Sequence, residues 1–122
     1  MSHVLGSGSM SYDRIMDFPG LFKDHFLPDK LHNINVSFTV DTAAENFGGT
    51  AGNISYNLAL LGLDPKIIST AGNDFGRFQT HLKKQNIDTA SVHIDSENPT
   101  SSAYVITDKG DNQIAAFSMG AG

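Results

Sequence analysis

The sequence contains no cysteine among its 122 residues, which excludes disulfide bonds and thiolate metal sites. It also lacks an apolar run long enough to span a bilayer, so a membrane partner is not expected. No secretory pattern opens the chain, because the short apolar pair Val4 and Leu5 is followed at once by glycine and serine. These absences predict a soluble, cytoplasmic protein.

Basic residues are few, with 8 Lys and Arg against 13 Asp and Glu and a net charge of −5. They are scattered except for Lys83 and Lys84, so the chain offers no basic face to a nucleic-acid backbone. The histidines have no metal-ligand spacing, and we expect each to be solvated or locally hydrogen-bonded: His3, His25, His32, His81 and His93. Neither a nucleic acid nor a metal ion is therefore an expected partner.

The order of elements predicts the fold class. The hydrophobic fraction of 39% is low, but 122 residues suffice for one domain with a single core. We expect strands over residues 3–7, 65–72 and 87–94, with one helix ending before Gly62 and another over residues 77–85. Asp74 is expected to cap the second helix. This alternation with short connections is typical of a parallel sheet flanked by helices.

A glycine cluster precedes the first helix, in the stretch GGTAGNISYNLALLG over residues 48–62. Three glycines within five residues permit positive φ and close approach of a ligand to the backbone. The helical turn that follows offers unpaired N–H groups with a partial positive charge. We therefore expect a site for oxygen-rich ligands here, with Asn53 beside it. A tight turn without a ligand is the alternative.

The first helix is expected to bury one apolar face. Ile54, Leu58 and Leu61 recur at helical spacing, so that they lie on one side of the helix. Gly62 follows where a glycine in the left-handed region ends many helices.

Two further segments indicate β-structure outside this alternation. Residues 34–41 alternate apolar with polar side chains, which predicts a strand with one apolar face. Residues 102–107 and 113–118 flank DKGDN, whose residues tolerate positive φ. The second pair is therefore expected to form an antiparallel hairpin.

The glycine stretch resembles the first signature of the ribokinase-like (PfkB) family of sugar and nucleoside kinases. The resemblance rests on GGTAGNIS over residues 48–55, followed at the right spacings by Gly62 and Gly72. It continues in SYD at 11–13, GNDFG at 72–76, Pro99-Thr100 and DNQI at 111–114. It covers essentially the whole chain but only the N-terminal part of a family member. The last of these runs and the segment that contains Phe38 are weakly more similar to adenosine-kinase-like members than to ribokinase itself.

The resemblance implies a fold and a domain assignment. Residues 1–122 would form the N-terminal part of a Rossmann-like kinase domain, without its C-terminal nucleotide-binding half. Residues 34–41 and 102–118 would form a partial antiparallel β-lid over the sugar; an ordinary strand of the main sheet is the alternative for 34–41. Because such lids often meet in pairs, a homodimer through the lid or an exposed sheet edge is a further expectation.

Seven substrate-binding residues follow from the same resemblance. Asp13 is similar in position to the aspartate that grips the sugar hydroxyls, and a carboxylate can accept two hydrogen bonds from a vicinal diol. The others would lie around the sugar or base, on the glycine stretch and on the lid: Gly48, Gly49, Asn53, Phe38, Ala103 and Phe117. The expected ligand is therefore a small sugar or nucleoside.

The resemblance also implies what the chain lacks for catalysis. Family members transfer a phosphoryl group from ATP, with Mg²⁺, to a primary hydroxyl, and a later Gly-Ala-Gly-Asp motif supplies the catalytic residues. Residues 120–122 imitate the first three letters of that motif without the aspartate, and their position corresponds to the end of the lid. We therefore expect no catalytic residue and no metal or nucleotide site here, and an inactive chain.

Two other readings of the chain remain open. It could be a non-catalytic module that binds a sugar or nucleoside or serves assembly. It could also be part of a dinucleotide-binding enzyme, as Gly6 and Gly8 after a short strand suggest. The third glycine of that motif is missing, however, and Pro19-Gly20 would break its helix early. Residues 1–10 are also compatible with an expression linker.

Overall fold

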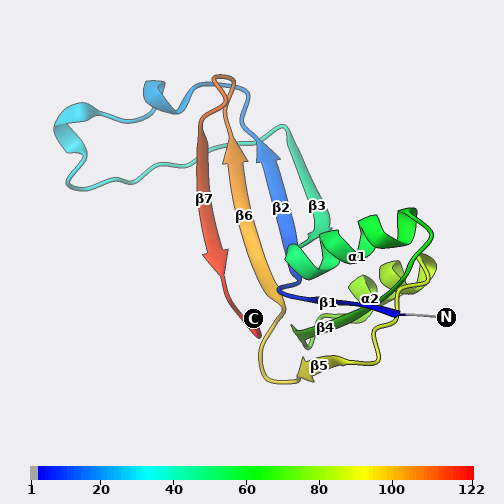
Figure 1. Cartoon of the computed structure of the whole chain (residues 1–122). Helices are drawn as coiled ribbons and strands as arrows, with labels where there is room; N and C mark the ends of the chain where they lie inside the picture. Colours follow the sequence, from blue (N-terminus) through cyan, green and yellow to red (C-terminus); the bar gives the residue numbers. More distant parts are fainter. Residues whose placement is uncertain (1–2) are drawn as a thin grey trace.

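The computed structural model describes residues 3–122 and confirms the predicted mixed α/β fold, with two separate sheets and two α-helices (Figure 1). Along the chain the elements are β1 (His3–Ser7), β2 (Ser11–Asp17), the short 3₁₀ turns η1 (Phe22–Asp24) and η2 (Pro28–Lys30), β3 (Thr42–Gly48), α1 (Thr50–Leu60), β4 (Asp64–Gly72), α2 (Gly76–Lys84), β5 (Val92–Asp95), β6 (Ser101–Thr107) and β7 (Gln113–Ser118). Among the described residues, no helix is long and apolar enough to cross a membrane.

The first sheet is parallel, as the sequence predicts, with β4 between β1 and β5. Its core joins one face of β4, through Ile67 and Ala71, to Ala51 of α1 and to Phe78 of α2. The opposite face of the same sheet leaves Leu5 and Ile68 exposed. Parallel sheets normally have both faces covered, but the described helices cover only one face of this sheet.

The second sheet has the order β3-β2-β6-β7, and we call it the lid sheet. Figure 1 shows it rising beside one end of the parallel sheet. The hairpin predicted over residues 102–118 is confirmed, because β6 and β7 pair antiparallel. β2 was not predicted, and it joins the hairpin through parallel pairing with β6. Asp13 therefore lies within a strand of the lid sheet, and not in a turn after the first strand.

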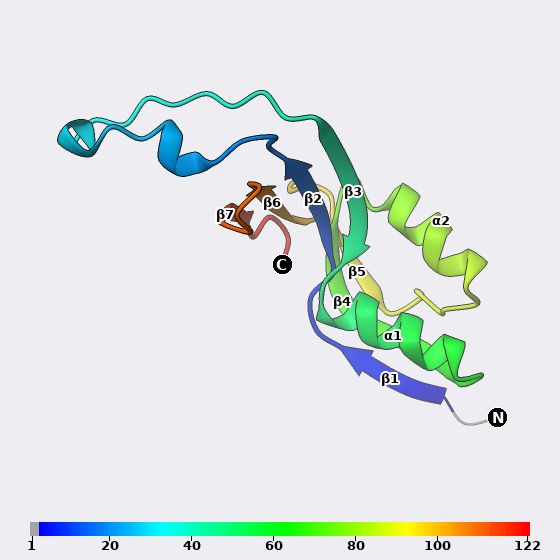
Figure 2. The same ribbon diagram turned by 90° about the horizontal axis from the view of Figure 1, so that it is seen from above.

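The prediction of a strand over residues 34–41 is wrong, because that segment is not paired with a neighbouring strand. The strand lies immediately after it, where β3 pairs antiparallel with β2 from Thr42 to Gly48. The alternation nevertheless has a structural basis, since Val36, Phe38 and Val40 are half-buried and the residues between them are exposed. It reflects one-sided packing of an extended segment. Figure 2 shows this loop between β2 and β3 extending away from both α-helices.

The buried face of α1 also differs from the prediction. Ile54 and Leu61 remain 44% and 76% exposed, and the fully buried positions are small residues: Ala51, Gly52 and Ser55. Small side chains let α1 approach its neighbours closely, and a Cβ on Gly52 would lie 3.2 Å from the Phe78 ring. The helix end is as predicted. Gly62 has φ +78°, and the N–H of Leu63 donates to the carbonyl of Leu58 at 3.1 Å.

The predicted strand over residues 87–94 is shorter than expected. β5 begins only at Val92, and Asp88 makes an isolated parallel bridge to Lys66. Ile87 instead belongs to the core beneath α2. The apolar run over residues 87–94 therefore contains both a residue that packs against α2, Ile87, and a strand, β5.

An ionic cluster joins the lid sheet to α2. Glu45 of β3 contacts the Nε of Arg14 at 3.2 Å and a terminal nitrogen of Arg77 at 3.0 Å. The guanidinium of Arg77 also lies 4.4 Å from the centre of the Tyr12 ring. Because Arg77 belongs to α2 and the other three residues to the lid sheet, the cluster fixes where the lid sheet meets the α/β layer.

Asp108 organises the turn between β6 and β7. Its carboxylate accepts hydrogen bonds from the backbone N–H groups of Phe22, Gly110 and Asn112, each at 2.9 Å. Burial alone would raise the pKa of Asp108, but these hydrogen bonds outweigh it and hold the pKa below its ordinary value. The turn is thereby tied to the loop that follows β2.

We expect Asp108 to make folding stability depend on pH in the acid range. A carboxyl group with a lowered pKa in the folded state stabilises it fully above the unfolded-state pKa of about 3.9, and loses that effect as the pH falls through the folded-state value. Asp108→Asn should therefore lower the thermal midpoint at pH 7 and reduce its drop between pH 5 and pH 2.5. Circular dichroism melts measure this, with the exposed Asp29→Asn as control. If the thermal midpoint fell equally between pH 5 and pH 2.5 in the wild type, Asp108→Asn and Asp29→Asn, Asp108 would not be the source of the pH dependence.

Candidate functional site

A cavity of about 410 Å³ lies between the lid sheet and the start of α1. It is lined by the loop after β1, by β2, β6 and β7, and by the glycine stretch: Ser9, Ser11, Asp13, Gly49, Thr50, Asn53, Ser101, Ser102, Ala103, Phe117, Ser118 and Met119. Five of the seven predicted substrate-binding residues are therefore brought together: Asp13, Gly49, Asn53, Ala103 and Phe117. They come from four elements that are far apart in the sequence.

Strand register places three of these residues in one row. Asp13 of β2 is paired with Ala103 of β6, and Ala103 is paired with Phe117 of β7. Paired residues point to the same face of a sheet, so a carboxylate, a methyl group and an aromatic ring follow one another across the lid sheet. The row offers a polar end for hydroxyl groups and an apolar end for a ring.

The Asp13 carboxylate is held in place from two sides. The hydroxyl of Ser11 donates to its Oδ1 at 2.8 Å. Gly48 lies directly beneath it, because a Cβ at that position would overlap the Asp13 carboxylate. Gly48, the sixth predicted residue, thus supports the cavity by leaving room for Asp13.

Gly49 is required by both its backbone conformation and its surroundings. It has φ +86°, a region that side-chain-bearing residues rarely adopt. A Cβ there would lie 2.6 Å from the Met10 Cα and from the Ser9 carbonyl oxygen, and neither backbone atom can move aside easily. The glycine therefore allows the loop after β1 to touch the start of α1.

Gly49→Ala should destabilise the fold by about 3 kcal/mol or more, because the positive-φ, extended conformation of Gly49 (ψ 157°) costs other residues about 1–3 kcal/mol and the backbone overlap adds to that. Gly62→Ala is the matched control, since Gly62 has φ +78° but nothing within 4 Å of its added Cβ. It should cost only about 1 kcal/mol. Urea unfolding monitored by circular dichroism compares the two. Equal losses would show that the close contact at Gly49 carries no energy.

Two N–H groups in the first turn of α1 contact the loop after β1. The N–H of Ala51 donates to the Ser9 carbonyl at 2.9 Å, and the N–H of Thr50 is 3.4 Å from the Ser9 hydroxyl. Residues 3–122 also contain no group of three His, Asp or Glu side chains that could hold a metal ion.

Phe38, the seventh predicted residue, lies outside the cavity. Its ring packs 4.8 Å from Phe18 and 5.1 Å from Phe22, within the loop between β2 and β3. The serines of the cavity, in contrast, escaped prediction apart from Ser11: Ser9, Ser101, Ser102 and Ser118. Only strand register brings Ser101, opposite Ser11, to the cavity.

Gly72 and Pro99-Thr100, which the resemblance also includes, pack against each other beside the site. A Cβ on Gly72 would overlap the backbone of Pro99 and Thr100, and the Gly72 N–H donates to the Thr100 hydroxyl at 2.9 Å. Asp74 does not cap α2 as predicted, because it accepts the Thr100 N–H at 2.8 Å. Burial alone would raise the pKa of Asp74, yet the Thr100 hydrogen bonds lower it.

A carboxylate and a glycine turn line the same small cavity of this α/β fold. Residues 8–122 match the family model described as pfkB family carbohydrate kinase. The chain therefore belongs to the pfkB family of carbohydrate kinases, as the signature predicts.

Two curated relatives are named nucleoside kinase. The one from Methanocaldococcus jannaschii is 31% identical over 98 residues, which is 79% of this chain and 32% of the relative. The one from Methanothermobacter thermautotrophicus is 30% identical over 95 residues, 76% of this chain and 31% of the relative. The chain thus spans about a third of the length of these relatives.

Several solved structures share the fold of this chain. The Burkholderia thailandensis nucleoside kinase in complex with inosine is 36% identical, with a TM-score of 0.78 over 98% of this chain and 37% of that protein. The Methanocaldococcus jannaschii nucleoside kinase reaches a TM-score of 0.82 at 27% identity, over 99% of this chain and 38% of that one. A Cryptococcus neoformans ribokinase in complex with ADP, 17% identical, shares the fold at a TM-score of 0.78.

Proposed function

We propose that this chain is the nucleoside-binding part of an ATP-dependent kinase that phosphorylates a primary hydroxyl. The observation that carries the proposal is the cavity that unites Asp13, Gly49 and Asn53 beneath the lid sheet. Asp13 would accept hydrogen bonds from the two ribose hydroxyls, and the apolar end at Ala103 and Phe117 would contact the base. A relative at 36% identity was solved with inosine, which supports a nucleoside as the ligand.

ATP and Mg²⁺ would bind to a part of the full-length protein other than residues 3–122, since the chain spans only about a third of the length of its curated relatives. Phosphoryl transfer needs a base, stabilisation of the transferred group and a metal-held nucleotide. This chain would supply substrate positioning alone. Binding by the isolated chain should be weak, because one wall of the cleft would be missing.

Parallel titrations with adenosine, inosine, free ribose and NAD test the proposal by ligand-observed NMR. We expect saturable binding of both nucleosides, weaker binding of ribose, and no tighter binding of NAD than of adenosine. The dinucleotide alternative predicts the opposite order, with NAD tightest. Absence of nucleoside binding to the folded chain would contradict the proposal and leave the non-catalytic assembly module as the better reading.

Self-association is also part of the proposal. All six residues of the edge strand β7 are exposed, and the parallel sheet leaves Leu5 and Ile68 open. An exposed strand edge and an uncovered apolar face both favour pairing with a second copy. Light scattering should therefore show dimers at concentrations of tens of micromolar, and a compact monomer throughout would argue against this expectation.

A further inference from the structure

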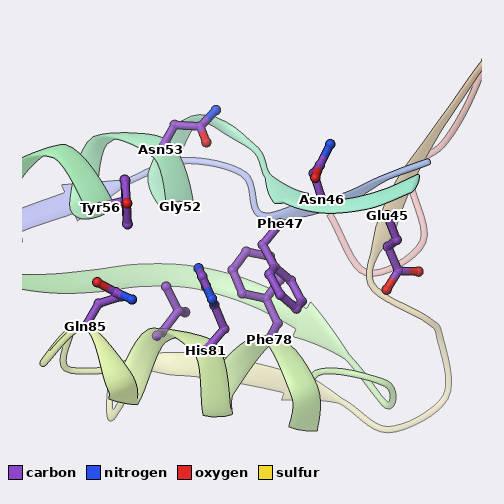
Figure 3. Close-up of a pocket in the computed structure, with 10 residues that line it drawn as sticks. Glu45, Asn46, Phe47, Gly52, Asn53, Tyr56, Phe78, His81 and Gln85 are labelled. Atoms are coloured by element: carbon purple, nitrogen blue, oxygen red, sulfur yellow. The ribbon is translucent and has the colours of Figure 1, made fainter. Parts of the chain in front are cut away.

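A second cavity, of about 500 Å³, lies where β3 meets α1 and α2 (Figure 3). Of the ten residues that line it, only Asn53 also lines the candidate sugar cavity. The function proposed above makes no use of it, so its chemistry can be considered separately.

Three aromatic rings define the shape of this cavity. The His81 ring lies 4.6 Å from the Phe47 ring at an interplanar angle of 24°, and 6.5 Å from the Tyr56 ring at 20°. Figure 3 shows Phe47 and Tyr56 on opposite sides of His81. Aromatic rings stack at centroid separations of about 4.5–7 Å. Because Phe47 and Tyr56 flank His81, a further planar ring can extend this row only at Tyr56, which is 39% exposed.

The remaining wall combines an apolar base with one hydrogen-bonding edge. Phe78 and Leu82 of α2 are both buried and line the cavity with carbon atoms. The amide of Gln85 lies near Tyr56 and His81 in Figure 3, and an amide offers a donor and an acceptor together. This pairing suits a ring that carries both kinds of group on one edge.

The charges of the cavity disfavour a phosphate group inside it. None of the ten lining residues is Lys or Arg. Glu45 is the only carboxylate among them, and Arg14 and Arg77 already pair with it. A phosphate group entering the cavity would therefore lose its hydration and meet no cationic partner within it.

We propose that this cavity binds an uncharged planar heteroaromatic ring of the nucleobase class, stacked against Tyr56 and hydrogen-bonded to Gln85. This site goes beyond the proposed kinase function and is separate from the sugar cavity. Because its walls come from the lid sheet and from both helices, a bound ring would bridge the two layers of the fold.

Saturation-transfer NMR on the full chain, with adenine as the probe, tests the proposal. Tyr56→Leu and Gln85→Ala alter the cavity, and Asp13→Asn alters the sugar cavity. Tyr104→Leu is the matched control, because Tyr104 is 41% exposed and Tyr56 is 39% exposed, but Tyr104 lies outside the cavity. Cyclohexanol and AMP serve as the non-aromatic and charged comparison ligands. Circular dichroism melts confirm that each variant is folded.

We expect adenine to bind saturably, with Tyr56→Leu weakening it about ten-fold and Gln85→Ala weakening it by a smaller factor. Asp13→Asn and Tyr104→Leu should leave it unchanged, and AMP and cyclohexanol should bind more weakly. Absence of adenine binding to the wild-type chain overturns the proposal. Binding that Tyr56→Leu leaves unchanged overturns it too, whether or not that binding depends on Asp13, because adenine held by Ala103 and Phe117 in the sugar cavity would behave in this way. If Tyr56→Leu fails to fold, an unchanged affinity in Gln85→Ala overturns it instead.

Discussion

The purified chain should release no ADP from Mg²⁺-ATP with adenosine, inosine, ribose or fructose as acceptor. A general base contributes about 10²–10⁴-fold and stabilisation of the transferred group is usually worth more, so their joint absence puts turnover below detection. The described residues contain no group that fits a metal ion, and Ser9 already occupies the first turn of α1. Asp13 cannot replace the base if it holds hydroxyls that do not react.

A coupled ADP-release assay measures this directly. Asp13→Ala, purified in the same way, is the control for contaminating kinases, because contamination would give equal rates in both preparations. Turnover by the wild-type chain that disappears in Asp13→Ala would contradict the account. Turnover that appears only after addition of the C-terminal part of the full-length protein would support it.

Asp13→Ala should weaken nucleoside binding by about ten- to a hundred-fold. Hydrogen bonds to a charged group contribute about 1.5–3 kcal/mol, and alanine offers no acceptor in their place. Asp17→Ala is the matched control: Asp17 lies on the same face of β2, but outside the cavity, where it accepts a hydrogen bond from Thr42. Isothermal titration calorimetry compares the two variants. Equal affinities in both would show that Asp13 does not contact the ligand.

Local sequence signals predicted the parts of the fold that short-range chemistry determines. Gly62 ends α1 because only a residue that tolerates positive φ can close that helix. The β6–β7 hairpin follows from a turn whose residues accept such conformations, with Asp111 at φ +59°. These features depend on neighbours within a few residues, so the sequence reveals them.

Elements that depend on distant partners were missed or misplaced. β2 carries charged side chains on both faces, Asp13 on one and Arg14 on the other, so no apolar alternation reveals it. Its pairing with β6 spans about 90 residues, which no local pattern contains. The segment around Phe38 shows the reverse error, because its alternation arises from packing on Phe18 and Phe22 without strand pairing.

The candidate site divides in the same way. Family resemblance supplied Asp13, Gly49 and Asn53, and the structure places all three around one cavity. The serines that complete it, and the aromatic cavity where β3 meets α1 and α2, depend on strand register and helix packing. These serines and aromatic residues form no motif in the sequence, because only the folded chain brings them together.

The most direct measurement of the central claim is a cycle that combines Asp13→Ala with removal of the ribose hydroxyls. Inosine and 2′,3′-dideoxyinosine are titrated against the wild-type chain and the variant. If Asp13 binds the diol, removing the hydroxyls should weaken wild-type binding at least ten-fold and leave the variant nearly unaffected. The same loss in both proteins, or no loss in either, would contradict the assignment of Asp13 to the sugar.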